Sequence, residues 1–418
     1  MYFAIRPISM AVYALKGIKY NGIETKLIFI SFLLYTIISI LLKCQIKGIN
    51  KSKISINRID KRLIIFTLII ILLIYFFNYF FLPKEMLLYA KRSRNFITVK
   101  DYYFNTFNGS IFYMIVLFIL GKNFNILLEK LKQKNLSNLI SFLYILFSFV
   151  LLYAQIVLRK NNINDQLFTE PGVYLLLSDY FALFSIFVLG TKKKIITKII
   201  VFLNSAYWLL KLGSRTSFYI FILLAFVVIF RTILKRKKFI RYFFIFLIIL
   251  IIFSLNKNNY ETILYENNRM LVLLENMLGD ASFIGRQRHM IEGFNDILEN
   301  FFIGKLFVGV LKDGQLGEYI HNIFSYWAEF GLIPFIILFY LNIKYSIVNI
   351  KYIFKNKEEN YLLSILSLFS ILVCLISRSY IYPYLWLGLS ISIYNTQINE
   401  KSKNSNCKEK DCGGVANV

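Results

Sequence analysis

One uninterrupted apolar segment restricts what this chain can fold into more than any other feature. Residues Leu63–Leu82 form a run of 20 residues that contains no charged side chain. A helix of about 20 apolar residues can cross the hydrocarbon core of a bilayer. A helix on a soluble protein keeps one polar face, whereas a helix surrounded by lipid or protein can be apolar on every side. This segment therefore predicts a membrane-spanning helix.

Comparable apolar runs recur along the whole chain. Apolar residues make up 57% of the 418 positions and charged residues 17%, against about 45–50% and about 25% in soluble proteins. We therefore expect an all-α polytopic membrane protein with 11 transmembrane helices and one large outer loop. The predicted spans are residues 27–42, 63–82, 104–121, 138–158, 172–190, 195–211, 216–231, 239–255, 322–342, 361–377 and 381–396. The weakest of these is 104–121.

The first 20 residues leave two interpretations open. They are apolar but are interrupted by Arg6 and Pro7, and the unbroken run Ile8–Leu15 is too short to span a bilayer. They lack the charge order and the small-residue cleavage site of a signal peptide. The segment is either an interfacial helix or a twelfth, imperfect span.

The distribution of positive charge predicts the orientation in the membrane. The net charge is +26, and alternate connections between spans hold 29 Lys and Arg in one set and 16 in the other. Short loops rich in Lys and Arg stay in the cytoplasm, so we expect the C-terminus inside and the loop 256–321 outside. That loop holds six Lys or Arg and nine Asp or Glu. The charge is thus interpreted as a topology signal, and no nucleic-acid partner is expected.

The chain is expected to form one membrane domain over residues 1–418. In the loop 256–321 we predict two helices, Asn267–Leu278 and Gly285–Phe302, which would form a packed lid over the membrane. The polar, Lys-rich segment 397–418 is expected to be a disordered cytoplasmic tail.

Cationic side chains on the predicted outer side go against the topological bias, and Arg215 is the first of them. It follows Gly213 and Ser214 where a span begins from the outside. Ser214 is a natural N-cap, and the free N–H groups and positive dipole end of the helix favour an anion. A guanidinium can bind a phosphate through two parallel hydrogen bonds. Arg215 is therefore a candidate anion ligand, and the alternative is that it extends into the lipid headgroups.

Arg286 and Arg288 lie at the expected start of the second loop helix. Glu292 stands four positions after Arg288, which is the spacing of a helical ion pair. Met290 stands four positions after Arg286, so the same pairing is not open to it. A cation at a helix start is also disfavoured by the helix dipole. Arg286 is the stronger candidate for an anion site, and Arg288 stays a candidate.

His321 and Asn322 lie where the outer loop enters the next predicted span. An imidazole can change its charge near neutral pH and can serve as a base or a donor, although a lone histidine is often structural. Ser325 and Glu329 follow at one and two helical turns and would face inward. An acid inside a span needs a role or a partner. Gly331 and Pro334 are expected to mark a kink.

Two further observations concern the chemistry. The sequence holds no Asp-x-Asp pair, no P-loop and no dinucleotide glycine motif, and the loop shows no cluster at metal-ligand spacing. We therefore expect no cofactor and no metal, and arginines would have to neutralise any pyrophosphate. Arg378, in the short outer connection 378–380, is a further candidate for substrate binding.

Taken together, these motifs resemble the bacterial O-antigen ligase and repeat-unit polymerase superfamily (Wzy-type). Its members are multi-span proteins with one large, late outer loop and a Gly-Ser-Arg sequence that opens a span. The loop typically carries an Arg and, 18 residues later, a glycine turn, which Arg286 and Gly304 match. The next span opens with His-Asn and continues to Glu-x-Gly, matched by 321–322 and 329–331. The resemblance covers about residues 213–334.

The chain departs from the family pattern at two positions. The aromatic residue that follows the loop Arg is Met290 here, and the proline before the glycine turn is Phe301. The choice between Arg286 and Arg288 therefore stays open.

The resemblance implies a GT-C-like, metal-independent glycosyltransferase in the bacterial cytoplasmic membrane, with its active face outward. It would join undecaprenyl-pyrophosphate-linked oligosaccharide repeat units into O-antigen or capsular polysaccharide. Donor and acceptor glycans, membrane lipids and a chain-length regulator protein are the implied partners. The implied catalytic residues are His321, Arg215, Arg286 and Arg288, and the implied substrate-binding residues are Ser214, Asn322, Glu329 and Arg378. A ligase of the same superfamily and a lipid-linked oligosaccharide flippase or other transporter remain as alternatives.

Overall fold

The computed structural model describes most of the chain. The described residues are 58–90, 95–131, 134–160, 171–191, 194–234, 281–317, 319–355 and 358–396. Several predictions lie outside them, namely those on residues 1–20, the spans 27–42 and 239–255, the helix Asn267–Leu278 and the tail 397–418. The described residues are mostly helical, in agreement with the predicted fold class.

Four of the described helices are long and apolar enough to cross a membrane. They cover Val99–Lys122, Ile195–Leu212, Arg215–Thr232 and Leu332–Phe354. Three shorter apolar helices cover Asn138–Tyr153, Leu175–Thr191 and Tyr361–Ile376. The protein is therefore membrane-embedded and α-helical, as predicted. The segment 104–121, which looked weakest in the sequence, falls within one of the four long helices.

The described residues divide into two compact units, one made of residues 131–284 and the other of residues 58–130 and 285–396. The prediction of a single membrane domain stays a prediction.

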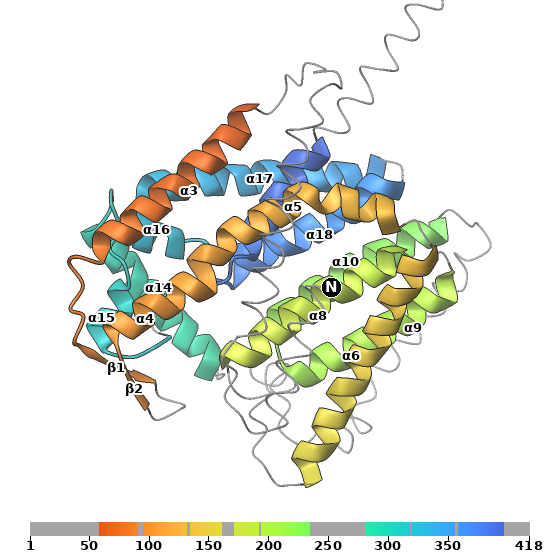
Figure 1. Cartoon of the computed structure of the whole chain (residues 1–418), viewed down its shortest axis with the longest axis horizontal. Coiled ribbons are helices and arrows are strands. Elements are labelled where there is room, and N and C mark those ends of the chain that lie inside the picture. The colour runs from red at the N-terminus through yellow and green to blue at the C-terminus, as the bar shows by residue number, and fades with distance from the viewer. Residues whose placement is uncertain are drawn as a thin grey trace, which may run out of the picture. The chain divides into compact units, whose positions relative to one another are not determined.

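The first unit is a bundle of four helices (Figure 1). These are α6 (Lys134–Lys160), α8 (Pro171–Thr191), α9 (Ile195–Leu212) and α10 (Arg215–Leu234). Helices α8, α9 and α10 pack against one another, and α6 packs against α8 and α9. The chain reverses between α9 and α10 at Gly213, whose φ of 71° is a left-handed conformation that glycine adopts without strain.

The second unit contains the remaining elements. In chain order they are α3 (Arg58–Asn78), β1 (Leu87–Ala90), β2 (Asn95–Thr98), α4 (Val99–Thr106), the π-helical turn η1 (Phe107–Ile111), α5 (Phe112–Leu131), α14 (Ala281–Glu299), α15 (Val308–Asp313), α16 (Ser325–Phe330), α17 (Leu332–Lys355) and α18 (Glu358–Ile376). Residues 384–396 form a further helix. Helix α17 packs against α3, α16 and α18. The first residues of α14 and the last residue of α5 fall across the boundary between the units.

A short β-hairpin accompanies the predicted helices in the described residues. Strands β1 and β2 pair antiparallel, with Leu87 opposite Thr98 and Ala90 opposite Asn95. Tyr89 of β1 also donates from its N–H to the carbonyl of Gly314 at 2.7 Å. Strands of four residues are too short for their periodicity to stand out in the sequence.

The predicted span 322–342 is wrong in its boundaries. Helix α16 ends at Phe330, and the long apolar helix begins at Leu332. Between them Gly331 has a φ of 82°, and a Cβ at this position would overlap the backbone of Phe302 and Ile303. The expected kink at Gly331 is therefore a complete break between two helices, and Glu329 precedes the span instead of lying within it.

Candidate functional site

Three segments that are far apart in the sequence meet in the second unit. They are the N-terminal half of α14, the segment 319–322 before α16, and the segment 377–382 after α18. The ring of His321 lies 4.7 Å from that of Tyr319 and 5.8 Å from that of His289, measured between centroids. The charge of Arg378, in the segment after α18, acts on both Tyr319 and His321. The two histidines of the chain thus belong to one cluster.

A glycine in α14 allows the segment before α16 to approach closely. A Cβ at Gly293 would overlap the side chain of Ile320. Ile320 packs with Ile297 of α14 and with Val308 in a small apolar core. Because Ile320 is anchored in this way, its neighbour His321 is held next to His289.

The surroundings of His321 keep its imidazole neutral. Burial, followed by the charges of Arg286, His289 and Arg378, lowers the pKa of His321 from 6.5 to about 3. Arg286 and Arg378 also act on the nearby Tyr319, whose pKa is raised because burial outweighs their effect. At neutral pH the cluster therefore presents two guanidinium groups around an uncharged imidazole that can accept a proton.

Arg286 and Arg288 have different environments, although only one residue separates them. Arg286 is half-buried and acts on His321. The side chain of Arg288 is 59% exposed and lies 3.5 Å from Glu292, as the sequence spacing predicted. The two side chains project from different sides of the helix. The structure thus links Arg286 to His321, whereas Arg288 pairs with Glu292, which lies 3.8 Å from His289.

One argument made from the sequence about Arg286 is wrong. Helix α14 begins at Ala281, four residues before the predicted start at Gly285. Arg286 therefore lies in the second turn and not at the helix start, where the dipole would act on it most strongly.

Arg378 is the most deeply buried cation of the cluster. Its side chain is 1% exposed. It donates from Nη1 to the Oγ of Ser377 at 3.1 Å, and its guanidinium lies 5.3 Å from the centre of the Tyr382 ring. An aromatic face stabilises a desolvated cation at this distance. Arg378, the candidate with the least support in the sequence, is thus part of the histidine cluster.

Glu329 is buried on α16 and contacts the loop before α15. Its carboxyl group accepts a hydrogen bond from the N–H of Phe307 at 2.5 Å. Burial raises the pKa of Glu329 to about 8, and the hydrogen bond from Phe307 opposes that shift. Ser325, one turn earlier, accepts from the N–H of Tyr380 at 2.9 Å. The prediction that Ser325 and Glu329 face inward is confirmed.

The loop that meets Glu329 is conformationally unusual. Phe307 has a φ of 61°, the only positive value among the described residues that are not glycine. Such a conformation costs free energy in a bulky residue and persists where surrounding contacts impose it. The bond from its N–H to the carboxylate of Glu329 is one such contact.

A cavity of about 270 Å³ lies beside the histidine cluster. His289, Tyr319, Ser325 and Glu329 belong to its wall, so the cavity and the cluster share residues. The remaining polar wall comes from α14 and α15, through Glu292, Asn295, Asp296, Glu299, Lys312 and Asp313. The cavity is therefore a polar space with several carboxylates.

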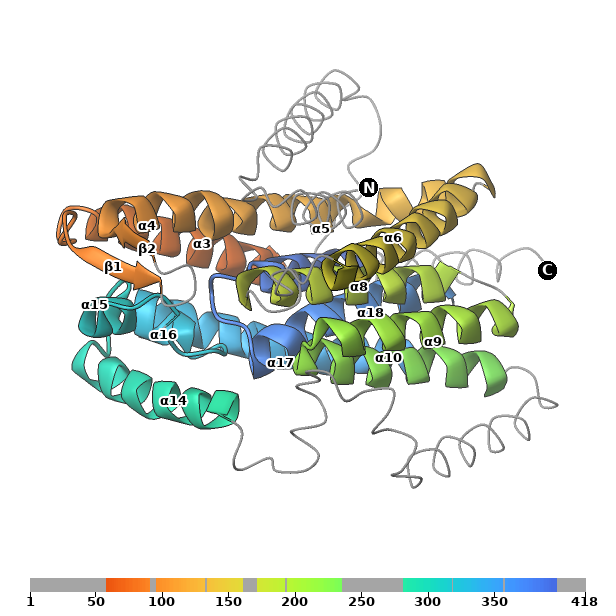
Figure 2. The same cartoon turned by 90° about the horizontal axis from the view of Figure 1, so that it is seen from below.

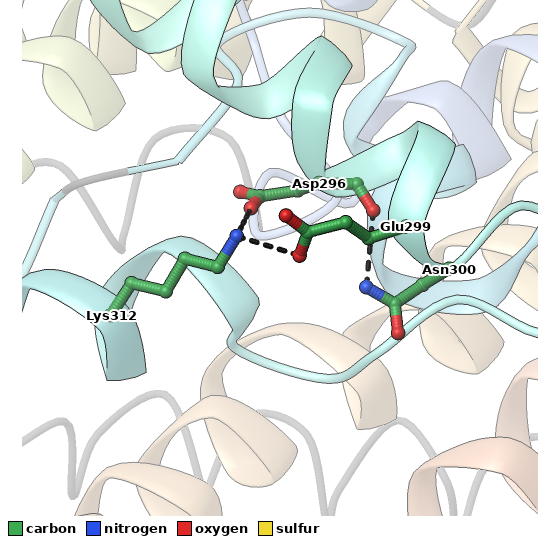
Figure 3. A network of polar contacts seen from close by, with 4 residues as sticks. All are labelled: Asp296, Glu299, Asn300 and Lys312. Carbon is green, nitrogen blue, oxygen red and sulfur yellow. Dashed lines mark hydrogen bonds and ion pairs between the residues drawn. The ribbon is translucent and has the colours of Figure 1, made fainter.

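Lys312 organises the acidic side of this cavity (Figure 3). Its ammonium binds the carboxylate of the buried Asp296 and lies 2.9 Å from that of Glu299. Asn300 donates to the backbone carbonyl of Asp296 at 3.1 Å. The hydrogen bonds to the two carboxylates raise the pKa of Lys312. These contacts connect α15 to the C-terminal half of α14.

Asn322 has a local structural contact. Its side-chain oxygen accepts a hydrogen bond from the N–H of Phe324 at 3.0 Å. This contact shapes the turn into α16. A role in substrate binding stays a prediction for this residue.

Arg215 and Ser214 lie in the first unit, which is described by itself. Arg215 is the first residue of α10. The hydroxyl of Ser214 lies 2.7 Å from that of Ser217, which donates to the carboxylate of Asp179 on α8. Ser214 thus takes part in a buried polar network as well as preceding the helix. Whether Arg215 joins the histidine cluster stays a prediction.

Some residues of the site were missed in the sequence. Tyr319 and Asp296 carry no local pattern that marks them, because their partners are distant along the chain. Asp179 could have been found, since it is an acid within the apolar run of α8, where an unpaired carboxylate would be costly.

Among the described residues, no group of three or more His, Cys, Asp and Glu side chains is arranged to hold a metal ion. The expectation of a metal-independent reaction stays a prediction. Comparison with protein-family models, with curated proteins and with solved structures found no match. Function is therefore inferred from the chemistry of the site.

Proposed function

We propose that this protein is a repeat-unit polymerase of the bacterial cytoplasmic membrane. It would transfer a growing glycan from an undecaprenyl-pyrophosphate carrier to a second lipid-linked oligosaccharide. One observation carries the proposal, namely that Arg286 and Arg378 act on a neutral His321 beside a polar cavity. Each part of this arrangement matches one requirement of the reaction.

The leaving group is the first requirement. When the bond between the anomeric carbon and the pyrophosphate oxygen breaks, the electron pair stays on the lipid pyrophosphate. Cationic donors held in a fixed geometry stabilise such developing charge better than mobile ones. A buried guanidinium such as that of Arg378 suits this purpose, because it is planar and presents several N–H groups.

The acceptor is the second requirement. An acceptor hydroxyl attacks the anomeric carbon, forms the new glycosidic bond and loses its proton. A neutral imidazole can receive that proton. The pKa of His321 is low partly because the positive charges of Arg286 and Arg378 act on it. A bound pyrophosphate would offset their charge and raise the pKa of His321, so donor binding would make the base stronger.

The sugar is the third requirement. Sugar hydroxyls donate and accept hydrogen bonds, and the carboxylate, tyrosine and histidine side chains around the cavity offer both functions. The cavity shares His289 and Tyr319 with the histidine cluster. A sugar bound there would lie next to the proposed pyrophosphate site.

The topology proposed from the charge distribution is consistent with this role. With eleven spans and the loop 256–321 outside, α14, α15 and the histidine cluster would lie at the outer face. Lipid-linked repeat units would meet the site there. A reporter fused after Asn300 should then be active only outside the cytoplasm, and cytoplasmic activity of that fusion would overturn the orientation.

The direct test is reconstitution of the purified protein in vesicles that contain one lipid-linked repeat unit. We expect a ladder of lipid-linked chains that differ by whole repeat units. A ligase would form product only after a different acceptor is added, and a transporter would move the unit across the bilayer without forming a glycosidic bond. Either result would contradict the proposal.

A further inference from the structure

Helix α14 exposes an apolar stripe that the site does not use. Gly293, Asp296 and Ile297 form its buried side. Its polar side carries Arg288, Glu292, Asn295 and Glu299, all of which are exposed. A third side carries Ile284, Ile291 and Leu298, which are 51%, 66% and 70% exposed and recur every seven residues. The sequence predicted only one polar and one apolar side.

The stripe continues past the end of the helix. Phe302 and Ile303 are 74% and 70% exposed. The carbonyl of Phe302 accepts a hydrogen bond from the N–H of Leu332, the first residue of α17. Close by on α17, Ile333 and Ile336 are also more than half exposed. Because α17 is one of the helices long and apolar enough to cross a membrane, its exposed apolar residues face lipid.

The packing of α16 shows where α14 lies relative to α17. Because the chain breaks at Gly331, α16 packs against the start of α17. Phe324 and Trp327 both stack on Phe335 of α17, at 5.3 and 4.8 Å between ring centroids. Helix α14 follows α16, with Phe294 lying 5.1 Å from Phe324. Figure 2 shows α14 beside α15 and α16. The middle of α14 is therefore connected, through Phe324, to Phe335 in the first turn of α17.

We propose that the stripe formed by Ile284, Ile291, Leu298, Phe302 and Ile303 is covered by the acyl chains of the bilayer. Helix α14 then lies at the edge of the membrane, with lipid on one side, protein on the second and water on the third. This proposed placement differs from the lid over the membrane that the sequence predicted. The occupant is lipid because the stripe is continuous with the lipid-facing side of α17. The inference does not depend on the proposed function.

The test uses nitroxide labels on the full-length protein in phosphatidylcholine vesicles. Cys44, Cys374, Cys407 and Cys412 are first replaced by serine, and one cysteine is then introduced at each chosen position. Leu298→Cys probes the stripe, and the adjacent Glu299→Cys on the polar side is its matched control. Ile336→Cys on α17 gives the reference for lipid exposure. The accessibility of each label to oxygen and to a water-soluble nickel complex is measured.

We expect the label at 298 to match that at 336, with high access to oxygen and low access to nickel, while the label at 299 shows the reverse. High nickel access at 298 would mean that the stripe faces water and would overturn the proposal. Low access to both reagents would mean that a second copy or another protein covers it, which would also overturn it. Ile291→Cys repeats the test at an independent position in case one labelled variant does not fold.

Discussion

The rings of His289 and His321 lie 5.8 Å apart, with an angle of 61° between their planes. The two residues are 32 positions apart in the sequence and belong to different elements. His289 also contributes to the low pKa of His321. The only two histidines of the chain are therefore electrostatically coupled, and neither can be treated as independent of the other.

The first prediction compares the two arginines of α14. Arg286→Gln should reduce the rate of polymerisation by about 10²–10³-fold, the usual effect of removing one donor that stabilises developing charge. Arg288→Gln is the matched control, because it removes the same charge from a solvent-exposed position on the same helix. Rates would be measured on the purified variants with lipid-linked repeat units. Equal losses in the two variants would remove Arg286 from the site.

The second prediction concerns His321. His321→Gln should lower the rate by about 10²–10⁴-fold if the imidazole accepts the proton of the acceptor hydroxyl. Cells that carry this variant should accumulate single repeat units on the lipid at normal protein levels. His289→Gln leaves the proposed base in place and should cost less. If both variants made polymers of full length, a structural role for His321 would be correct.

The third prediction concerns the dependence of stability on pH. Glu329 has a pKa of about 8 in the folded protein and an ordinary value of 4.5. Between these values the folded state holds a proton that the unfolded state has released, so stability falls as the pH rises, by at most about 1.4 kcal/mol per pH unit. Glu329→Gln should remove this fall. The stability of the wild type and of Glu329→Gln would be measured as the Tm in detergent across pH 4.5–8.

Titration of His321 should change the stability in the opposite direction with pH. The contributions of Glu329 and His321 to the pH dependence of stability can therefore be separated. Its pKa of about 3 in the folded protein lies below the ordinary 6.5. Between these values only the unfolded state binds the proton, so stability rises with pH in that window. His321→Gln should flatten the rise between about pH 3 and 6.5. Identical Tm profiles for wild type and both variants would show that neither group titrates as described.

The fourth prediction tests the close approach at Gly293. Gly293→Ala introduces a Cβ that overlaps Ile320, and overpacking of this kind costs about 1–3 kcal/mol. Gly285→Ala, on the same helix, meets open space and should raise stability by up to about 1 kcal/mol. The two Tm values would be compared with the polymerisation rates. Ile320→Ala removes both overlapping atoms, so the double variant Gly293→Ala with Ile320→Ala should lose less stability than the sum of the two single losses. A simply additive loss would argue against the overlap.

Sequence reasoning found most residues of the histidine cluster but not the way they meet. Arg286, His321 and Arg378 were each selected because a cation or an imidazole on the outer side needs a reason. Their mutual contacts could not be predicted, because they depend on tertiary packing between segments some 30 to 90 residues apart. Tyr319 shows the same limit, since nothing in its own neighbourhood indicates that it faces His321.

The helices were predicted better than their ends. The apolar period located α8, α9 and α10 to within a few residues. The predicted span began too early because residues 322–331, which mix polar side chains such as Asn322 and Glu329 with apolar and aromatic ones, were joined to the apolar run that follows. In the structure Gly331, with its positive φ, separates the two helices. A glycine that must adopt a positive φ looks like any other glycine in the sequence.

The hairpin has a consequence for how such a protein can change over time. Tyr89 donates to the carbonyl of Gly314, and its own carbonyl accepts from the N–H of Leu316 at 3.1 Å. Both bonds use main-chain atoms, so they do not depend on the identity of the side chains that line the neighbouring cavity. The segment after α15 is thereby held to β1 by its backbone. Side chains of the cavity wall can therefore change by point substitution while this attachment is kept.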